Sequence, residues 1–248
     1  MLDESRKKIN DIDAQLKKLF LQRRELVADV AKHKKQHNLP ILDSNRERSV
    51  ITQHADGDLF TKAFFENLMD TCKNYEIHLM LNKNIVLIGM MGSGKSTIGH
   101  MLSNLLDLPF VDTDKIIERK SNLSIPQIFQ ESGEAEFRRL ENQTITEFSK
   151  ASPQIIATGG GVIKNPENMR LLKKNGIVFF LNRPVRAIAL DLRKSNKRPL
   201  LQSFSDLFNI YSERMPIYKK YADHTVFGNY SVESATRVIL KKLLTRAL

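Results

Sequence analysis

The sequence GMMGSGKST occupies residues 89–97 and directly follows the apolar run IVLI at residues 85–88. It fits the pattern G-x-x-x-x-G-K-[ST], in which glycines let backbone N–H groups turn inward around phosphate oxygens. A helix that begins inside the motif adds the partial positive charge of its N-terminus. Lys95 can then reach the outer phosphates of a nucleotide, and the Ser96 hydroxyl can ligate Mg²⁺. The stretch therefore predicts a phosphate-binding loop rather than a chance glycine-rich turn.

The run at residues 85–88 is β-branched and uninterrupted, as is typical of a buried parallel strand. Strand-like runs recur at residues 109–111, 154–157 and 177–181, with helical patterns between them. Strands that alternate with helices favour an α/β domain with a central parallel sheet. We expect this P-loop domain to occupy residues 83–248.

Residues 1–82 have a different pattern, with Pro40 and Gly57 as their only proline and glycine. Helical periodicity predicts one helix over residues 3–37, a second after Pro40 that ends before Ala55, and a third over about residues 59–81. A first helix of ~35 residues is about 50 Å long and exceeds what two shorter helices can cover. We therefore expect an all-α three-helix domain that forms an intertwined homodimer.

The chain of 248 residues carries a net charge of +11, from 39 basic and 28 acidic residues. Residues 1–82 hold 14 basic and 13 acidic residues, so the remaining 25 basic and 15 acidic residues give residues 83–248 a net +10. That excess suits small polyanionic substrates better than nucleic acid, because the chain has no Trp and no long Lys/Arg run. The apolar runs are too short to span a membrane, no secretion leader opens the chain, and Cys72 is its only cysteine. We expect a cytoplasmic protein.

Two carboxylates lie at the end of the second predicted strand, in Asp112-Thr113-Asp114. The side-chain period of an extended chain is 2, so both carboxylates face one side. Ligands of parallel sheets bind at the carboxyl ends of strands, so one carboxylate could serve a metal and the other a substrate hydroxyl. A turn or a helix cap is the alternative interpretation.

Further candidates follow along the chain. Arg138 and Glu141 share one helix face, although an exposed ion pair would look the same. The triplet Gly159-Gly160-Gly161 follows an apolar strand and permits close approach of a ligand, unless it is a simple loop. Arg198 begins an RPLL sequence in a candidate lid, and Arg214 precedes a proline.

In their order and spacing, these residues resemble the shikimate kinase family over residues 84–248. The resemblance implies ATP as donor, Mg²⁺ as cofactor and the shikimate 3-hydroxyl as acceptor. It implies that Asp114 is the base, that Asp112 and Ser96 serve the metal, and that Lys95 and Arg198 stabilise the transferred phosphoryl group. The implied ATP-binding residues are Gly89, Gly92, Ser93, Gly94, Lys95, Ser96, Thr97, Arg193, which would stack on adenine, and Arg198. The implied shikimate-binding residues are Asp114, Arg138, Glu141, Gly159, Gly160, Gly161 and Arg214.

The first helix has a cation inside its apolar seam, because the seam continues through Arg23. A buried arginine is costly unless an anion pairs with it, although a polar residue can also set the register of a helical interface. Lys34 returns to within ~20° of Arg23 at about 100° per residue, so two cations share one face. Arg6 points elsewhere and would have to serve this pocket from a partner chain. The pair predicts a dianionic ligand.

The third helix has a matching anomaly, in that its apolar row includes Cys72 and Glu76. The predicted second helix offers Asp43, Arg46 and Glu47 close together. Each of these residues taken alone could be ordinary surface charge.

Together these positions resemble the all-helical chorismate mutase family over about residues 2–80. The resemblance implies that Arg6 of one chain and Arg23 of the other bind the two carboxylates of chorismate. It implies that Lys34 contacts the ether oxygen, that Glu47 contacts the hydroxyl, and that Asp43 and Arg46 line the pocket. Two residues depart from the family pattern: Cys72 stands where Ser is frequent, and Glu76 where Gln is frequent. Gln can donate to the ether oxygen, whereas an ionised Glu cannot, so we expect mutase activity that weakens as pH rises.

The sequence thus predicts a bifunctional enzyme of aromatic amino-acid biosynthesis that phosphorylates shikimate and rearranges chorismate to prephenate. The main alternative is a shikimate kinase whose helical domain only dimerises or senses a metabolite. A nucleic-acid-dependent NTPase and a related small-molecule kinase, for example of gluconate, are further alternatives. The expected partners are small molecules and a second copy of the chain, with no nucleic acid and no membrane.

Overall fold

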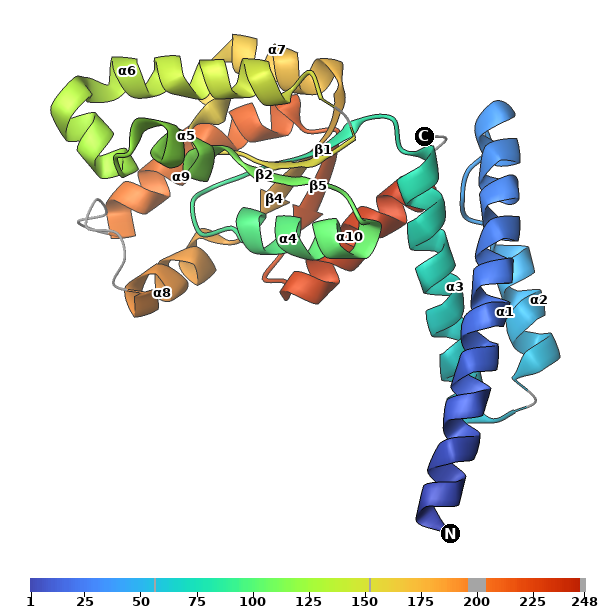
Figure 1. The fold of residues 1–248 in the computed structure, drawn as a ribbon. Helices are drawn as coiled ribbons and strands as arrows, with labels where there is room; N and C mark the ends of the chain where they lie inside the picture. The colour runs from blue at the N-terminus through green and yellow to red at the C-terminus, as the bar shows by residue number, and fades with distance from the viewer. Residues whose placement is uncertain (56, 152, 196–203, 246–248) are drawn as a thin grey trace. The chain divides into compact units, whose positions relative to one another are not determined.

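The computed structural model describes residues 1–55, 57–151, 153–195 and 204–245 (Figure 1). It separates into two compact units. One contains residues Met1–Met80 together with the chain from Leu243, and the other contains Leu81–Lys242. No helix in the described part of the chain is long and apolar enough to cross a membrane.

The first unit contains three helices, as predicted: α1 (Leu2–Gln36), α2 (Ser44–His54) and α3 (Leu59–Met80). The Asp43 side chain caps α2 by accepting a hydrogen bond from the backbone N–H of Arg46 at 3.0 Å. α3 packs against both α1 and α2. Its buried face includes Met69, Cys72 and Ile77.

Much of the apolar seam of α1 is exposed within a single chain. Ile9 and Ile12 are each 54% exposed, and Leu19 is 59% exposed. Apolar side chains in a regular row normally pack against another element. The homodimer that we expect would cover this row, and it remains a prediction.

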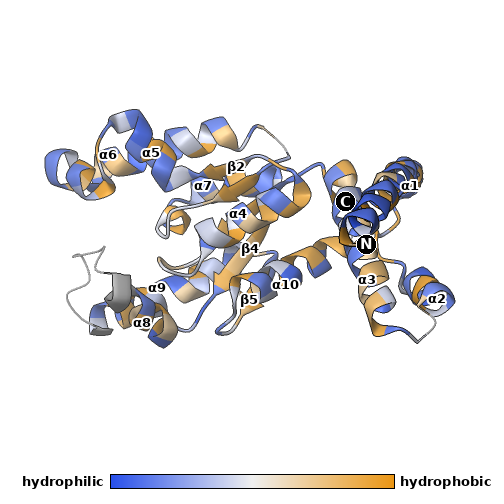
Figure 2. Cartoon of the chain, turned by 60° about the horizontal axis from the view of Figure 1, so that its bottom comes forward, coloured by the Kyte–Doolittle hydropathy of each residue, from blue (hydrophilic) through white to orange (hydrophobic). Residues whose placement is uncertain are grey.

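The second unit is the expected α/β domain. Its five strands are β1 (Asn84–Ile88), β2 (Phe110–Asp112), β3 (Ile155–Ala157), β4 (Gly176–Asn182) and β5 (His224–Phe227). They form one sheet in the order β2-β3-β1-β4-β5, and every pairing is parallel. β1 and β4 are buried along their whole length, which accounts for their unbroken apolar sequences; Figure 2 shows β4 as hydrophobic.

Helices surround this sheet (Figure 1). They are α4 (Lys95–Leu106), α5 (Thr113–Ser121), α6 (Ile125–Phe148), α7 (Pro166–Lys174), α8 (Val185–Ser195), α9 (Phe204–Tyr221) and α10 (Val232–Leu244), with a short 3₁₀ helix at Val162–Lys164. The sequence analysis missed β5, because this edge strand alternates exposed and buried positions and has no continuous apolar run.

The parallel sheet brings four strand ends to one edge. Gly89 follows β1, Thr113 follows β2, Thr158 follows β3 and Arg183 follows β4. Loops at the carboxyl ends of parallel strands form the ligand crevice of such folds. Residues that are far apart in the sequence therefore meet at this edge.

Candidate active sites

The phosphate loop has the backbone conformation that its glycines permit. Gly89, Gly92 and Gly94 have φ values of 148°, 73° and 92°. A Cβ at Gly89 would lie 2.8 Å from the carbonyl oxygen of Leu181, so only glycine fits there. Gly94 is the N-cap residue of α4, which starts at Lys95. The N-terminus of α4 therefore points into the loop, as the motif requires.

Lys95 and the expected metal-binding residues lie close to this loop. The Lys95 Nζ is buried and donates to the carbonyl oxygens of Gly89 and Met90, at 2.9 Å each. The Ser96 hydroxyl donates to Asp112 Oδ2 at 2.6 Å. Two neighbouring oxygen ligands of this kind suit Mg²⁺, which keeps several waters and shares its coordination with substrate phosphates. Asp112 also caps α5 through the Lys115 N–H, so the helix-cap interpretation holds as well.

The glycine triplet brings the proposed base and a substrate-binding arginine together. A Cβ at Gly159 would lie 2.5 Å from Asp114 Oδ1, and a Cβ at Gly161 would lie 2.8 Å from both Nη atoms of Arg138. Any larger side chain at these two glycines would displace Asp114 or Arg138. A carboxylate and a guanidinium therefore border the same short backbone segment.

Glu141 holds Arg138 from the buried side. Its Oε2 accepts a hydrogen bond from Arg138 Nη1 at 3.0 Å, and Glu141 is only 1% exposed. Burial raises the pKa of Glu141, the charge and hydrogen bond of Arg138 oppose this, and the charge of Asp114 adds to the increase. Arg214 also approaches, donating from Nη1 to the Gly160 carbonyl at 3.2 Å. Its buried Nε has no hydrogen-bond partner among the described residues, so it is available to a ligand.

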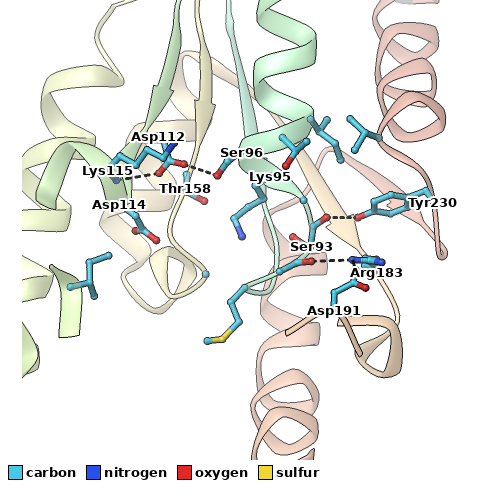
Figure 3. Close-up of a pocket in the computed structure, with 18 of the residues that line it drawn as sticks. Ser93, Lys95, Ser96, Asp112, Asp114, Lys115, Thr158, Arg183, Asp191 and Tyr230 are labelled. Atoms are coloured by element: carbon cyan, nitrogen blue, oxygen red, sulfur yellow. Dashed lines mark hydrogen bonds and ion pairs between the residues drawn. The ribbon is translucent and has the colours of Figure 1, made fainter. Parts of the chain in front are cut away.

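A cavity of about 670 Å³ lies at the phosphate loop and extends to Asp114 and Gly160 (Figure 3). Of the predicted residues, Gly92–Thr97, Asp112, Asp114 and Gly160 line it. The described residues that line it do not include Gly89, Arg138, Glu141, Gly159, Gly161 and Arg214. Lys115, Glu118, Arg183, Asp191 and Tyr230 line it too, and the sequence analysis did not select them. Arg198 lies outside the described residues, and the Arg193 side chain is not described either.

A second pocket, of about 340 Å³, lies among the three helices of the first unit. It is lined by all the residues predicted for chorismate except Arg6, namely Arg23, Lys34, Asp43, Arg46, Glu47, Cys72 and Glu76. The Lys34 Nζ donates to Glu76 Oε2 at 2.8 Å and to the Ile41 carbonyl at 2.7 Å. Arg23 Nη1 donates to Cys72 Sγ at 2.5 Å. The two residues that depart from the family pattern thus contact the two principal cations.

Arg6 lies outside this pocket. Its side chain is 68% exposed and pairs with Asp3 at 3.7 Å. This placement agrees with the expectation that Arg6 points away from Arg23 on the same helix. That Arg6 reaches the pocket of a second copy of the chain stays a prediction.

The sequence analysis also missed Lys73, which lines the pocket beside Cys72. Its Nζ lies 3.1 Å from Glu47 Oε2 and 2.9 Å from Asp70 Oδ1. Burial works against its charge, but hydrogen bonds to Asp70 and Glu47 leave the pKa of Lys73 above its ordinary value. No sequence signal separates Lys73 from the other surface lysines.

For Arg183, by contrast, a signal existed, because it directly follows the buried strand β4 and strand ends carry ligand sites. Tyr230 follows β5, the strand that the sequence did not reveal.

Comparisons with known proteins match both units of the chain to families. Residues 91–244 match the family model "Shikimate kinase", and residues 5–77 match "Chorismate mutase type II". A shikimate kinase of Caldicellulosiruptor bescii is 42% identical over 140 residues, which cover 55% of this chain and 81% of that protein. A shikimate kinase of Aquifex aeolicus is 39% identical over 165 residues, covering 66% and 98%.

Solved structures agree as well. A shikimate kinase from Acinetobacter baumannii in complex with shikimate aligns with a TM-score of 0.60 at 36% identity, covering 66% of this chain and 92% of that chain. The two matched regions lie within the regions for which the sequence analysis stated a resemblance to the same two families. The chain belongs to the shikimate kinase family, and it carries a chorismate mutase type II domain in addition to its kinase domain.

Proposed function

We propose that residues 83–248 transfer the γ-phosphoryl group of ATP to the 3-hydroxyl of shikimate. The observation that carries this proposal is the glycine triplet, which borders Asp114 on one side and Arg138 on the other. A hydroxyl acceptor that carries a carboxylate needs both groups, one near its hydroxyl and one near its carboxylate. The phosphate loop lies in the same cavity as Asp114.

The roles of the chain's own residues follow from this arrangement. Arg138 and Arg214 bind the substrate carboxylate, and Glu141 keeps Arg138 oriented. Asp114 accepts the proton of the attacking hydroxyl. Lys95 leaves its loop carbonyls for the phosphates and, with Arg198, neutralises charge on the transferred group. Mg²⁺, held by Ser96 and Asp112, would supply further charge neutralisation, and Arg193 would stack on adenine.

The test compares two adjacent arginines on α6. Arg138 lies beside the glycine triplet, whereas Arg139 pairs with Glu136 and its side chain is 54% exposed. Arg138→Met should raise the KM for shikimate about 100-fold, because a charge-assisted pair is lost. Arg139→Met should leave it within about twofold. Equal effects of the two changes, or no shikimate-dependent use of ATP by the wild type, would overturn the proposal.

We also propose that residues 1–82 convert chorismate to prephenate. The observation that carries this proposal is the pocket in which Arg23 and Lys34 face one small cavity among apolar side chains. The rearrangement is unimolecular, so the site must only hold a compact conformer and stabilise charge that grows on the ether oxygen. Arg23 binds a carboxylate, Lys34 contacts the ether oxygen, and Glu47 accepts a hydrogen bond from the hydroxyl. Asp43, Arg46 and Cys72 complete the wall, while Glu76 faces the ether oxygen beside Lys34.

The proposed mutase activity requires a homodimer, because Arg6 reaches the pocket only from a second copy of the chain. The exposed seam at Ile9, Ile12 and Leu19 supports such a dimer. We place the enzyme in the cytoplasm with small molecules as its ligands, and with neither a membrane nor nucleic acid as a partner.

Neighbouring arginines test the mutase as well. Arg23 lines the pocket, whereas Arg24 is exposed and lies over the ring of Tyr75. Arg23→Met should lower kcat/KM for chorismate at least 100-fold, which is about 2.7 kcal/mol. Arg24→Met should change it less than about threefold. A wild-type chain without chorismate turnover would refute this activity and favour a helical domain that only dimerises or senses a metabolite.

A further inference from the structure

Two side chains hold the phosphate loop from outside, at consecutive residues. The Tyr230 hydroxyl donates to the carbonyl oxygen of Ser93 at 3.1 Å. The Arg183 Nη1 donates to the carbonyl oxygen of Gly92 at 3.3 Å (Figure 3). Arg183 follows β4 and Tyr230 precedes α10, so the two donors come from different elements.

The loop needs such donors because of its own geometry. A loop that turns its N–H groups inward toward phosphate turns its carbonyl groups outward. A carbonyl that is removed from water costs about 1–3 kcal/mol if it finds no donor. This cost applies to the buried residue Ser93, whereas Gly92 is exposed and its hydrogen bond restrains the loop at the surface. Gly92 has a φ of 73°, a conformation that glycine tolerates but does not enforce. The hydrogen bonds to Gly92 and Ser93 therefore favour the phosphate-binding shape of the loop.

Lys95 supports the other half of the loop, but it cannot do so throughout the reaction. Its Nζ donates to Gly89 and Met90. The same ammonium group must reach the outer phosphates of a bound nucleotide. Arg183 and Tyr230 bind other carbonyls of the loop, those of Gly92 and Ser93, so they can keep their bonds when Lys95 gives up its own.

Both donors are themselves fixed. Arg183 pairs with Asp191 Oδ2 at 2.6 Å, and its side chain is 18% exposed. It also donates to Asn229 Oδ1 at 3.3 Å. Burial raises the pKa of Tyr230, although the charge of Arg183 opposes this, so the phenol keeps its proton. The Arg183 side chain is thus held by three partners, and the Tyr230 hydroxyl keeps the proton that it donates.

We infer that Arg183 and Tyr230 are positioning residues that preset the phosphate loop for nucleotide binding through the carbonyls of Gly92 and Ser93. The inference rests on the kinase function proposed above only in that the loop binds a nucleotide. It does not depend on the identity of the phosphoryl acceptor. The affinity for nucleotide should therefore depend on both residues, and the affinity for shikimate should not.

The experiment measures binding of ADP with Mg²⁺ to the full chain by titration calorimetry, and then the KM values for ATP and shikimate. The variants are Tyr230→Phe, which removes one hydroxyl, and Arg183→Met, with Arg183→Lys as a conservative variant. Tyr211→Phe is a matched control, because the Tyr211 hydroxyl donates to Asn182 and Tyr211 does not line the cavity. Arg170→Met is a second control, because Arg170 is exposed and pairs with Glu167.

Tyr230→Phe and Arg183→Met should each weaken ADP binding about five- to tenfold, as expected for one lost hydrogen bond to a loop. The KM for ATP should rise by the same factor, while the KM for shikimate stays within about twofold. In the two control variants, the ADP affinity and both KM values should stay within about twofold of the wild type. Arg183→Lys should recover part of the loss. Unchanged ADP affinity, or equal increases in both KM values, would overturn the inference even if the melting temperature fell. Loss of ADP affinity in a chain that does not phosphorylate shikimate would support the inference and refute the proposed acceptor.

Discussion

The kinase pocket is built within one chain, whereas the helical pocket has one expected residue outside it. In the kinase unit, residues after four parallel strands converge on one sheet edge, and Asp114, Arg138 and Arg214 all reach the same glycine triplet. In the helical unit, Arg6 is exposed and much of the α1 seam is exposed within one chain. A parallel sheet gathers residues from distant parts of one chain, but a long helix presents its face to whatever packs against it. The two sites should therefore respond differently to the same kind of perturbation.

The largest effects should come from removing one ammonium group in each unit. Lys95→Ala should lower kinase turnover by at least 1,000-fold, because phosphoryl transfer depends on charge neutralisation, and it should spare chorismate turnover. Lys34→Ala should lower chorismate turnover by a similar factor and leave kinase turnover unchanged. Steady-state assays of both reactions on each variant measure this. Joint loss of both activities in a folded variant would contradict the independence of the sites.

Breaking the apolar seam should affect the helical site alone. Leu16→Glu places a charge on the row of exposed apolar residues on α1, where Leu16 is 45% exposed. We expect the mass in sedimentation experiments to fall to that of one chain and mutase activity to fall about 50-fold, since burying an unpaired charge in an interface costs several kcal/mol. Kinase activity should stay within about twofold. Lys17→Glu, at the next position of α1, is the control; an unchanged mass for Leu16→Glu would refute the predicted dimer.

Replacing Glu76 should improve the mutase. Glu76→Gln removes the carboxylate that pairs with Lys34 and supplies an amide donor toward the ether oxygen. We expect kcat/KM for chorismate to rise about tenfold, because the amide can donate to the ether oxygen on which charge grows. Glu66→Gln, at an exposed position of the same helix, should change nothing. An unchanged kcat/KM for chorismate in Glu76→Gln would contradict this account.

The smallest effect concerns stability in the kinase unit. Burial raises the pKa of Glu141 above its ordinary value of 4.5. A raised pKa in the folded state gives stabilisation that is complete below pH 4.5 and is lost as pH rises through the folded-state value. Urea unfolding should show the wild type losing stability relative to Glu141→Gln in that window, with a constant difference above it. Glu147→Gln, at an exposed site of α6, should run parallel to the wild type throughout.

Much of the fold could be predicted because its signals are local. The motif at residues 89–97 defines a strand, a turn and a helix at once, and the buried strands β1 and β4 are continuous apolar runs. The end of α2 before Ala55 was equally visible, because the signals that end a helix lie within a few residues. β5 was missed because an edge strand buries only part of its surface.

The site residues likewise divide into those that local motifs reveal and those that only the tertiary structure reveals. Residues that belong to compact motifs, such as Lys95 and Asp112, could be selected from spacing alone. The end of β4 marks Arg183 as a candidate, but the positioning roles proposed for Arg183 and Tyr230 could not be predicted. They depend on contacts with Gly92 and Ser93, which lie 91 and 137 residues away in the sequence. The pairing of Lys34 with Glu76 joins two helices and likewise needed the tertiary structure.

The most direct test of the account is a crystal structure of the full chain with shikimate, ADP with Mg²⁺, and prephenate. We predict that the shikimate carboxylate lies between Arg138 and Arg214 beside the glycine triplet. We predict that the prephenate carboxylates lie between Arg23 of one chain and Arg6 of a second copy. Guanidinium groups that instead face solvent or protein carboxylates, with the ligands bound elsewhere, would contradict the claim that both sites place positive charge for small ring-shaped anions.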